Sequence, residues 1–265
     1  MSLMTENSYD TTRQIPKYGG FNFTLLRLEI RRILRNRRTT ISVVLMPVLL
    51  TLLFTLSHKD STEKIGLGNL SAFLVLSLAL YAGTQSAAFG GSIVAIERLS
   101  GWSRQLRITP LSSIAYIAVK ALTSLMLSLL SICAVFIVAF LTHQAHLPAG
   151  IWVACAACIW VGSLVFAAFG IFMGYLFPGE NASQIISFAM LIFSFAGGIF
   201  IPLSQFPHVV RDIAYYTPLY GLNELVHYPS LQSNFDIVWV ANAVAWFFLF
   251  FFGAAWKFRE DTKRV

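Results

Sequence analysis

The few residues of this chain that could do chemistry are concentrated in one polar stretch between long apolar runs, at residues 97–111 (ERLSGWSRQLRITPL). Its apolar residues recur at helical spacing and can share one face, with positive charge around them. The candidate residues are Glu97, Arg98, Gly101, Trp102, Arg104, Leu106, Arg107 and Pro110. Such a segment suits the binding of a soluble partner. The alternative is an ordinary positively charged loop that only fixes the topology of a membrane protein.

Other chemically capable side chains form weaker patterns. Cys155 and Cys158 have the spacing of a redox pair, but they lie in an apolar run, which favours packing. His143 and His146 are too few for a metal site, so none is predicted. No nucleophile stands beside a base, and no GxxxxGK[ST] phosphate-binding loop is present. We predict no catalytic residues and no ATPase site in this chain.

The composition assigns the chain to the membrane. Hydrophobic residues make up 57% and charged residues 12% of its 265 residues, with a mean hydropathy of +0.69. A soluble domain carries about 25% charged residues. The net charge of +7 could suggest a nucleic-acid partner. The basic residues lie at the ends of apolar runs, however, so they indicate membrane orientation and no nucleic acid is expected.

Six apolar runs approach the ~20 residues that a membrane-crossing helix needs. They cover about residues 41–57, 70–96, 114–142, 151–177, 183–201 and 237–256. Glycines at 83, 90 and 91 are expected to break the second run. We therefore predict an all-α integral membrane protein with six transmembrane helices. A single domain at 21–257 would follow a mobile N-terminal tail (1–20) and precede a cytoplasmic tail (258–265).

Residues 21–38 predict an amphipathic helix at the membrane surface, among anionic lipid headgroups. Its candidate contact residues are Arg27, Arg31, Arg32 and Arg35. Sixteen of the 19 Lys and Arg residues lie on the side that holds both termini and the 97–111 stretch, which predicts that this side is cytoplasmic. Lys120, near the start of the third run, is expected to snorkel to the interface.

The segment between the fifth and sixth runs is too apolar and aromatic for a solvated loop, yet its prolines forbid one long helix. We predict short re-entrant helices that dip into the outer leaflet. The residues singled out there are Pro202, Pro207, Pro218, Tyr220 and Glu224. For Glu224, a hydrogen-bonded structural acid is favoured over a contact at a substrate exit. The centres of the spans hold no Asp or Glu, which disfavours an ion-coupled carrier.

Together these features resemble the type-2 ABC exporter permeases. Residues 97–111 are similar to the signature of that family: an acidic and a basic residue, Gly101, a basic–Leu pair, then Thr109-Pro110-Leu111. Residues 197–207 and 216–220 resemble its apolar-proline pair before the last span. The resemblance extends over roughly residues 21–256.

The resemblance implies a transport subunit that binds no cofactor, with ATP and Mg²⁺ held by a separate cytoplasmic ATP-binding subunit in two copies. Residues 97–111 would be the coupling element that docks on that subunit. A second permease, identical or related, would complete a dimer in the cell membrane. A drug, antibiotic or lipid-like substrate would pass at the dimer seam, lined by the first, second and fifth spans. The alternatives are an ion-coupled or passive carrier without an ATPase and a membrane-embedded lipid-modifying enzyme.

Overall fold

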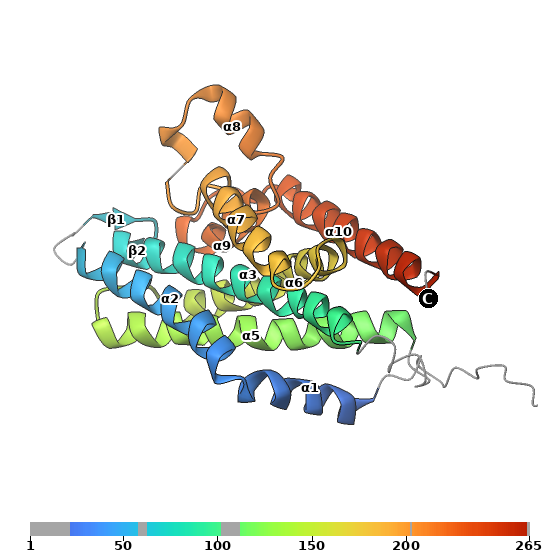
Figure 1. The fold of residues 1–265 in the computed structure, drawn as a ribbon. Helices are drawn as coiled ribbons and strands as arrows, with labels where there is room; N and C mark the ends of the chain where they lie inside the picture. The colour runs from blue at the N-terminus through green and yellow to red at the C-terminus, as the bar shows by residue number, and fades with distance from the viewer. Residues whose placement is uncertain (1–21, 58–62, 102–111, 202, 264–265) are drawn as a thin grey trace, which may run out of the picture.

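The computed structural model describes residues 22–57, 63–101, 112–201 and 203–263, and these are mostly helical (Figure 1). The elements, in chain order, are α1 (Phe23–Arg35), α2 (Arg37–Ser57), β1 (Lys64–Ile65), β2 (Gly68–Asn69), α3 (Leu70–Leu99), α5 (Ser113–Thr142), α6 (Ala149–Leu176), α7 (Asn181–Ala196), a 3-10 turn (Leu203–Gln205), α8 (His208–Ala214), α9 (Tyr220–Leu231) and α10 (Ile237–Lys263). The two short strands form an antiparallel hairpin.

Among the described residues, four helices are long and apolar enough to cross a membrane: α3, α5, α6 and α10. They confirm an all-α membrane protein and match four of the six predicted spans. The apolar parts of the other two, Val43–Ser57 of α2 and Asn181–Ala196 of α7, are shorter. Helix α7 ends well before the predicted residue 201 because two glycines follow it, and Gly198 has a left-handed φ of 77°.

The predicted surface helix at 21–38 is wrong at its C-terminal end. Helix α1 begins where the Asn22 side chain accepts a hydrogen bond from the Thr24 amide (2.8 Å), and it ends at Arg35. Asn36 has a non-helical backbone (φ −77°, ψ 85°), and residues 37 and 38 already belong to α2. A single residue therefore separates the surface helix from the first apolar helix.

Helix α3 lies at the centre of the molecule, between α5 and α6, and it is continuous. The prediction that glycines break it is wrong. They allow close helix packing instead: a Cβ at Gly91 would lie 2.6 Å from the carbonyl oxygen of Ala167 in α6. A Cβ at Gly170 of α6 would collide with the backbone of Ala88. The backbones of α3 and α6 therefore touch directly, as small-residue helix interfaces allow.

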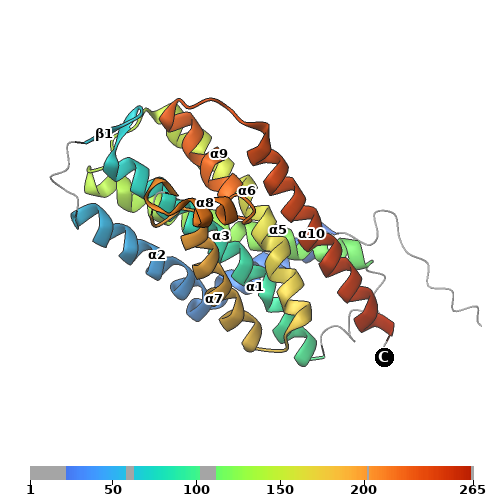
Figure 2. The ribbon, with the colours of Figure 1, turned by 90° about the horizontal axis from the view of Figure 1, so that it is seen from above.

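The hairpin organises the end of the bundle opposite to Glu97. The Asn69 side chain caps α3 by accepting from the Ala72 amide (3.1 Å), and it also donates to the Gln144 carbonyl (2.7 Å). The Leu67 amide donates to the Ser230 carbonyl at the end of α9 (2.8 Å). Figure 2 shows α10 running beside α6 and α9, which closes the other flank.

The α3–α6 contact predicts a position-specific cost of adding one methyl group. We expect Gly170→Ala to destabilise the protein by about 1–3 kcal/mol, because neither backbone can move away without disturbing the bundle. The matched control is Gly150→Ala in the same helix, where nothing lies within 4 Å of the added Cβ. Thermal unfolding in detergent should lower the Tm of the first variant only. Equal Tm values would contradict the direct backbone contact.

Candidate functional site

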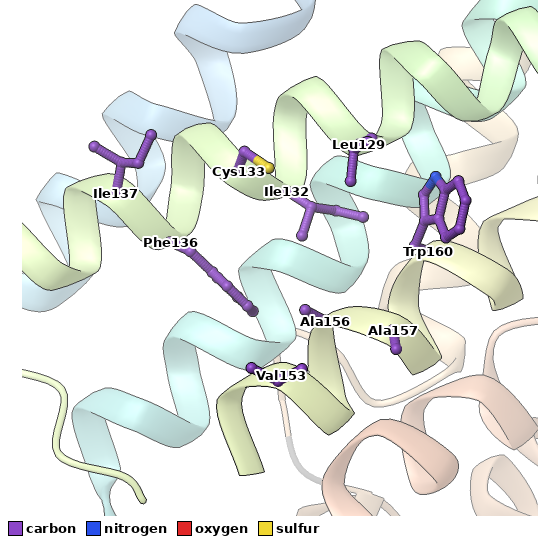
Figure 3. Close-up of a pocket in the computed structure, with 9 residues that line it drawn as sticks. All are labelled: Leu129, Ile132, Cys133, Phe136, Ile137, Val153, Ala156, Ala157 and Trp160. Atoms are coloured by element: carbon purple, nitrogen blue, oxygen red, sulfur yellow. The ribbon is translucent and has the colours of Figure 1, made fainter. Parts of the chain in front are cut away.

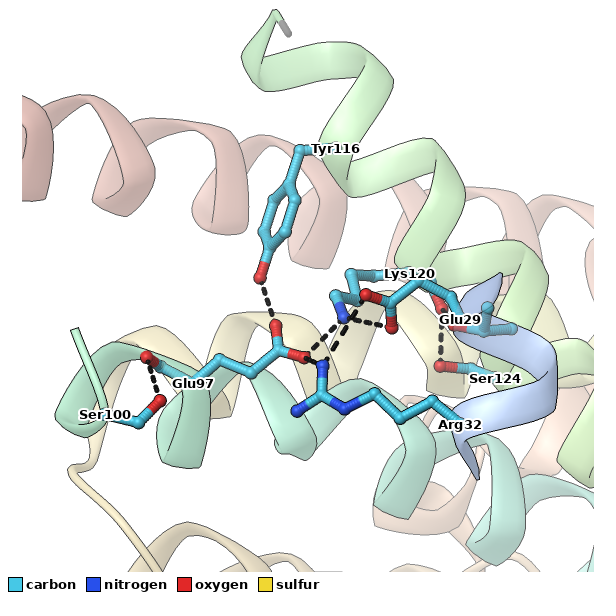
Figure 4. A network of polar contacts seen from close by, with 8 residues as sticks. Glu29, Arg32, Glu97, Ser100, Tyr116, Lys120 and Ser124 are labelled. Atoms are coloured by element: carbon cyan, nitrogen blue, oxygen red, sulfur yellow. Dashed lines mark hydrogen bonds and ion pairs between the residues drawn. The ribbon is translucent and has the colours of Figure 1, made fainter. Parts of the chain in front are cut away.

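A cluster of charged side chains joins three helices at the end of the bundle where α3 stops (Figure 4). This charge cluster consists of Glu29 and Arg32 from α1, Glu97 from α3, and Tyr116 and Lys120 from α5. The Lys120 Nζ donates to Glu97 Oε1 (2.6 Å) and to Glu29 Oε2 (2.8 Å). Arg32 Nη1 and Tyr116 OH complete the shell of Glu97, at 2.8 Å from Oε1 and 2.6 Å from Oε2.

Burial makes these contacts obligatory. The side chains of Lys120 and Glu97 are each 1% exposed and that of Glu29 is 7% exposed, whereas Arg32 is half exposed. An unpaired charge at such depth would cost several kcal/mol. The two carboxylates here face two cations, so the cluster is neutral as a whole, and Glu97 accepts from three donors. The charge cluster thus fixes α1 against α3 and α5.

Two of these residues were placed differently, or not at all, by the sequence analysis. The prediction that Lys120 snorkels to the interface is wrong, because its ammonium group turns inward to Glu29 and Glu97. Glu29 was not singled out. Each carries a signal in hindsight: Glu29 is the sole acid in α1, and Lys120 is the sole charged residue in α5. Two isolated charges of opposite sign on different helices are consistent with an ion pair between them.

The described start of the 97–111 stretch, residues 97–101, is held to the helix bundle by its side chains. Besides Glu97, the Arg98 guanidinium donates to the carbonyls of Gly174 (3.3 Å) and Tyr175 (2.9 Å) at the end of α6. Leu99 is 69% exposed, and Gly101, with φ 73°, turns the chain out of the helix. The remaining predicted coupling residues lie outside the described residues: Trp102, Arg104, Leu106, Arg107 and Pro110.

The predicted contact residues of the surface helix separate into two groups. Arg27, Arg31 and Arg35 are exposed along α1. Arg32 points its guanidinium back toward Glu97 and lies 3.6 Å from a carboxylate oxygen of Glu29. The helix is therefore held by one face and presents positive charge on the other.

The residues predicted between the fifth and sixth spans lie away from the charge cluster. Pro207 is the N-cap residue of α8, and Pro218 is buried in the turn between α8 and α9. Tyr220 is buried at the start of α9, and Pro202 lies outside the described residues. Glu224 is half-buried in α9, and burial raises its pKa. Desolvation, and secondarily the nearby Glu224, raises the pKa of Tyr220 to about 12. The two short helices exist, and their side chains are partly dehydrated.

His227 is a buried polar residue of α9 that the sequence analysis did not place in a site. Its Nδ1 lies 2.9 Å from the Asn223 carbonyl, so that nitrogen must carry the proton. Its Nε2 lies 3.1 Å from Ser77 Oγ on α3 and can accept from that hydroxyl. Burial lowers the pKa of His227 below its ordinary value of 6.5. The neutral imidazole links α9 to α3.

A hollow of about 410 Å³ lies between α5 and α6, beside Leu129, Phe136 and Trp160 (Figure 3). The indole nitrogen of Trp160 already donates to the Leu125 carbonyl (3.0 Å), so this hollow presents hydrocarbon and the Cys133 thiol. It has no charged group to orient a ligand. Within the described ranges, no three His, Cys, Asp or Glu residues are placed to hold a metal ion.

Comparison with known proteins connects this geometry to a family. Residues 22–231 match the family described as ABC-2 type transporter. The chain belongs to the ABC-2 type transporter family. It is also 24% identical, over 198 residues, to the Bacillus subtilis (strain 168) protein named "Putative transport permease YvfS"; the match covers 72% of this chain and 78% of that protein. The match to the ABC-2 family includes the whole charge cluster and the 97–111 stretch.

The family assigns the chain a general role as the membrane subunit of a transporter, and it implies an ATP-binding subunit as partner. In this ABC-2 protein the charge cluster includes Glu97, the first residue of the stretch that resembles the family signature. Both carboxylate oxygens of Glu97 and the ammonium group of Lys120 are used to hold helices together.

The charge cluster predicts a large effect of removing its central cation. We expect Lys120→Met to destabilise the protein by about 3–5 kcal/mol, because two buried carboxylates lose their ammonium partner. Adding Glu29→Gln and Glu97→Gln should recover part of this loss, since the uncompensated charges disappear. The control, Lys257→Met, breaks a partly exposed pair with Glu260 and should cost about 0–1 kcal/mol. Thermal unfolding compares the four proteins; similar Tm values for both lysine variants would exclude a buried cluster.

His227 predicts acid sensitivity. A buried group with a lowered pKa resists protonation while the unfolded chain accepts the proton, so stability is lost as the pH falls below about 6.5. The raised pKa of Glu224 acts in the opposite direction, but it does so equally in a His227→Gln variant. We expect the Tm to fall less between pH 7.5 and 5 for His227→Gln than for the wild type. The same fall in both proteins would contradict a neutral, buried His227.

Proposed function

We propose that this chain is the permease subunit of an ATP-driven exporter of hydrophobic or amphipathic compounds. A separate ATP-binding subunit, in two copies, docks on the 97–111 stretch and supplies the energy. ATP and Mg²⁺ belong to that subunit, and this chain performs no hydrolysis. The proposal is supported by the family and by one structural observation: Glu97, at the start of the stretch, is bound to both α1 and α5.

That observation gives the docking stretch a mechanical role. A force on residues 102–111 reaches α3 through Leu99 and reaches α5 through Ser112, whose hydroxyl caps α5 (3.2 Å to the Ala115 amide). The charge cluster then ties both helices to α1. Displacement of the docked subunit would thus move three helices together instead of bending a free loop. We propose this as the coupling step of transport.

The substrate path is proposed along α2, α3 and α7. These helices expose large apolar side chains such as Leu49, Leu53 and Phe188. Between α3 and α7, Gln85 Nε2 lies 3.4 Å from Ser187 Oγ, and the buried Gln85 Oε1 has no partner among the described residues. A second permease, identical or related, would cover this face and form the path at the seam. An apolar wall with isolated amide and hydroxyl groups suits amphipathic molecules.

The membrane arrangement belongs to the same proposal. We place six crossings in the cell membrane by adding α2 and α7 to the four long helices, with both termini in the cytoplasm. The short helices α8 and α9 then lie in the outer leaflet. The supporting facts are the apolar composition of α2 and α7 and the basic residues near the Glu97 end of the bundle.

The proposal predicts loss of the ATPase partner when the apolar face of the stretch is removed. We expect Trp102→Ala combined with Leu106→Ala to abolish copurification of the ATP-binding subunit, because buried anchor residues dominate such interfaces. ATP-dependent substrate uptake into inverted vesicles or proteoliposomes, and substrate-stimulated ATP hydrolysis, should fall to background.

The control is Trp256→Ala, which removes a 58% exposed tryptophan from α10 and should leave the partner bound. Retention of the ATP-binding subunit by the double variant would reject docking at this stretch. Solute movement by the purified chain without any nucleotide-hydrolysing subunit would reject the exporter itself.

A further inference from the structure

A positively charged groove of about 380 Å³ runs along α1. Its described lining is Leu28, Arg31, Arg32 and Arg35, which recur at i, i+3, i+4 and i+7 and so share one helical face. We call this feature the arginine groove. It lies apart from the 97–111 stretch in the sequence, and Arg32 joins it to Glu97 at the start of that stretch.

The arginine groove is electrostatically incomplete. Within the part of the chain that the structure describes, no carboxylate lies within ion-pair distance of Arg31 or Arg35. These two arginines are four residues apart on a helix, as are Arg27 and Arg31, and like charges at that spacing repel. Glu29, the one acid of α1, is already used by Lys120. An anion in the groove would relieve the repulsion.

The chemistry of the arginine groove selects a phosphate attached to hydrocarbon. Guanidinium groups bind phosphate oxygens through paired N–H donors, which favours phosphate over a plain point charge. Leu28 forms an apolar wall beside them and is 58% exposed, as are Leu34 (46%) and Phe23 (77%) on the same helix. Only Asn36 separates α1 from the apolar helix α2, so the groove lies close to the membrane surface.

We propose that the arginine groove is a binding site for the headgroup of an anionic phospholipid. The phosphate lies between Arg31 and Arg35, and an acyl chain covers Leu28. Arg32 connects this site with the charge cluster, because its guanidinium is half exposed while Nη1 holds Glu97. A bound headgroup and Glu97 therefore share one cation, so the lipid can adjust how firmly α1 is held against α3.

The test measures lipid binding to the purified full-length chain without any partner subunit. In phosphatidylcholine nanodiscs or detergent, phosphatidylglycerol is titrated, and retained lipid is counted by native mass spectrometry alongside the Tm. We expect Arg31→Gln and Arg35→Gln each to weaken phosphatidylglycerol binding about tenfold, the effect of losing one charge-assisted hydrogen-bonding group. The matched control, Arg27→Gln, removes the same charge from the same helix outside the groove and should change binding by less than about twofold.

Three outcomes would overturn the proposal. Equal effects of all three substitutions would indicate diffuse attraction to an anionic surface instead of a site. Inorganic phosphate that raises the Tm as much as the lipid does, at the same concentration, would indicate a free-anion site. Unchanged lipid binding in both Arg31→Gln and Arg35→Gln would show that the arginine groove does not hold the headgroup. The Tm of each variant before lipid addition verifies that it is folded.

Discussion

The ammonium group of Lys120 and the carboxylates of Glu97 and Glu29 determine the arrangement of one end of this molecule. Each of the three is buried, so none can lose its partners without leaving a charge in an apolar environment. The geometry at this end has little freedom, because one Nζ must stay within 2.6 and 2.8 Å of two oxygens from different helices. Helices α1, α3 and α5 are therefore fixed together near the end of α3, at the start of the 97–111 stretch.

Sequence reasoning predicted the long helices well because hydropathy and length alone decide them. The predicted runs at 114–142 and 237–256 differ from α5 and α10 mainly at their ends. Sequence reasoning failed where the position of a side chain depends on residues that are distant in the sequence. Lys120 and Glu29 lie 91 positions apart, and no local pattern shows that they meet. The glycines of α3 were interpreted as breaks because their purpose, close contact with α5 and α6, exists only in the folded bundle.

The signature stretch illustrates a second limit of reasoning from residue types. The charged residues at the start of the stretch are of the same types as those later in it, so all of them were assigned to one docking surface. The structure shows another role for the first two: Glu97 is 1% exposed and Arg98 donates to carbonyls of α6, so these two hold the bundle. The residue type gives the charge of a side chain, whereas only the fold gives the direction in which it points. The resemblance to the family rested on the order of residues, so it did not require knowing where any side chain points.

The glycine contact between α3 and α6 has a consequence for motion. Helices that pack through long side chains can shift relative to one another, because the side chains can change rotamer. Two backbones in direct contact have no such freedom. A Cβ-free surface at Gly91 and Gly170 leaves no compliant layer between them. We therefore expect α3 and α6 to move as one rigid unit during a conformational change. Rearrangement is left to seams built from larger, softer side chains, such as those of α2 and α7 on the periphery.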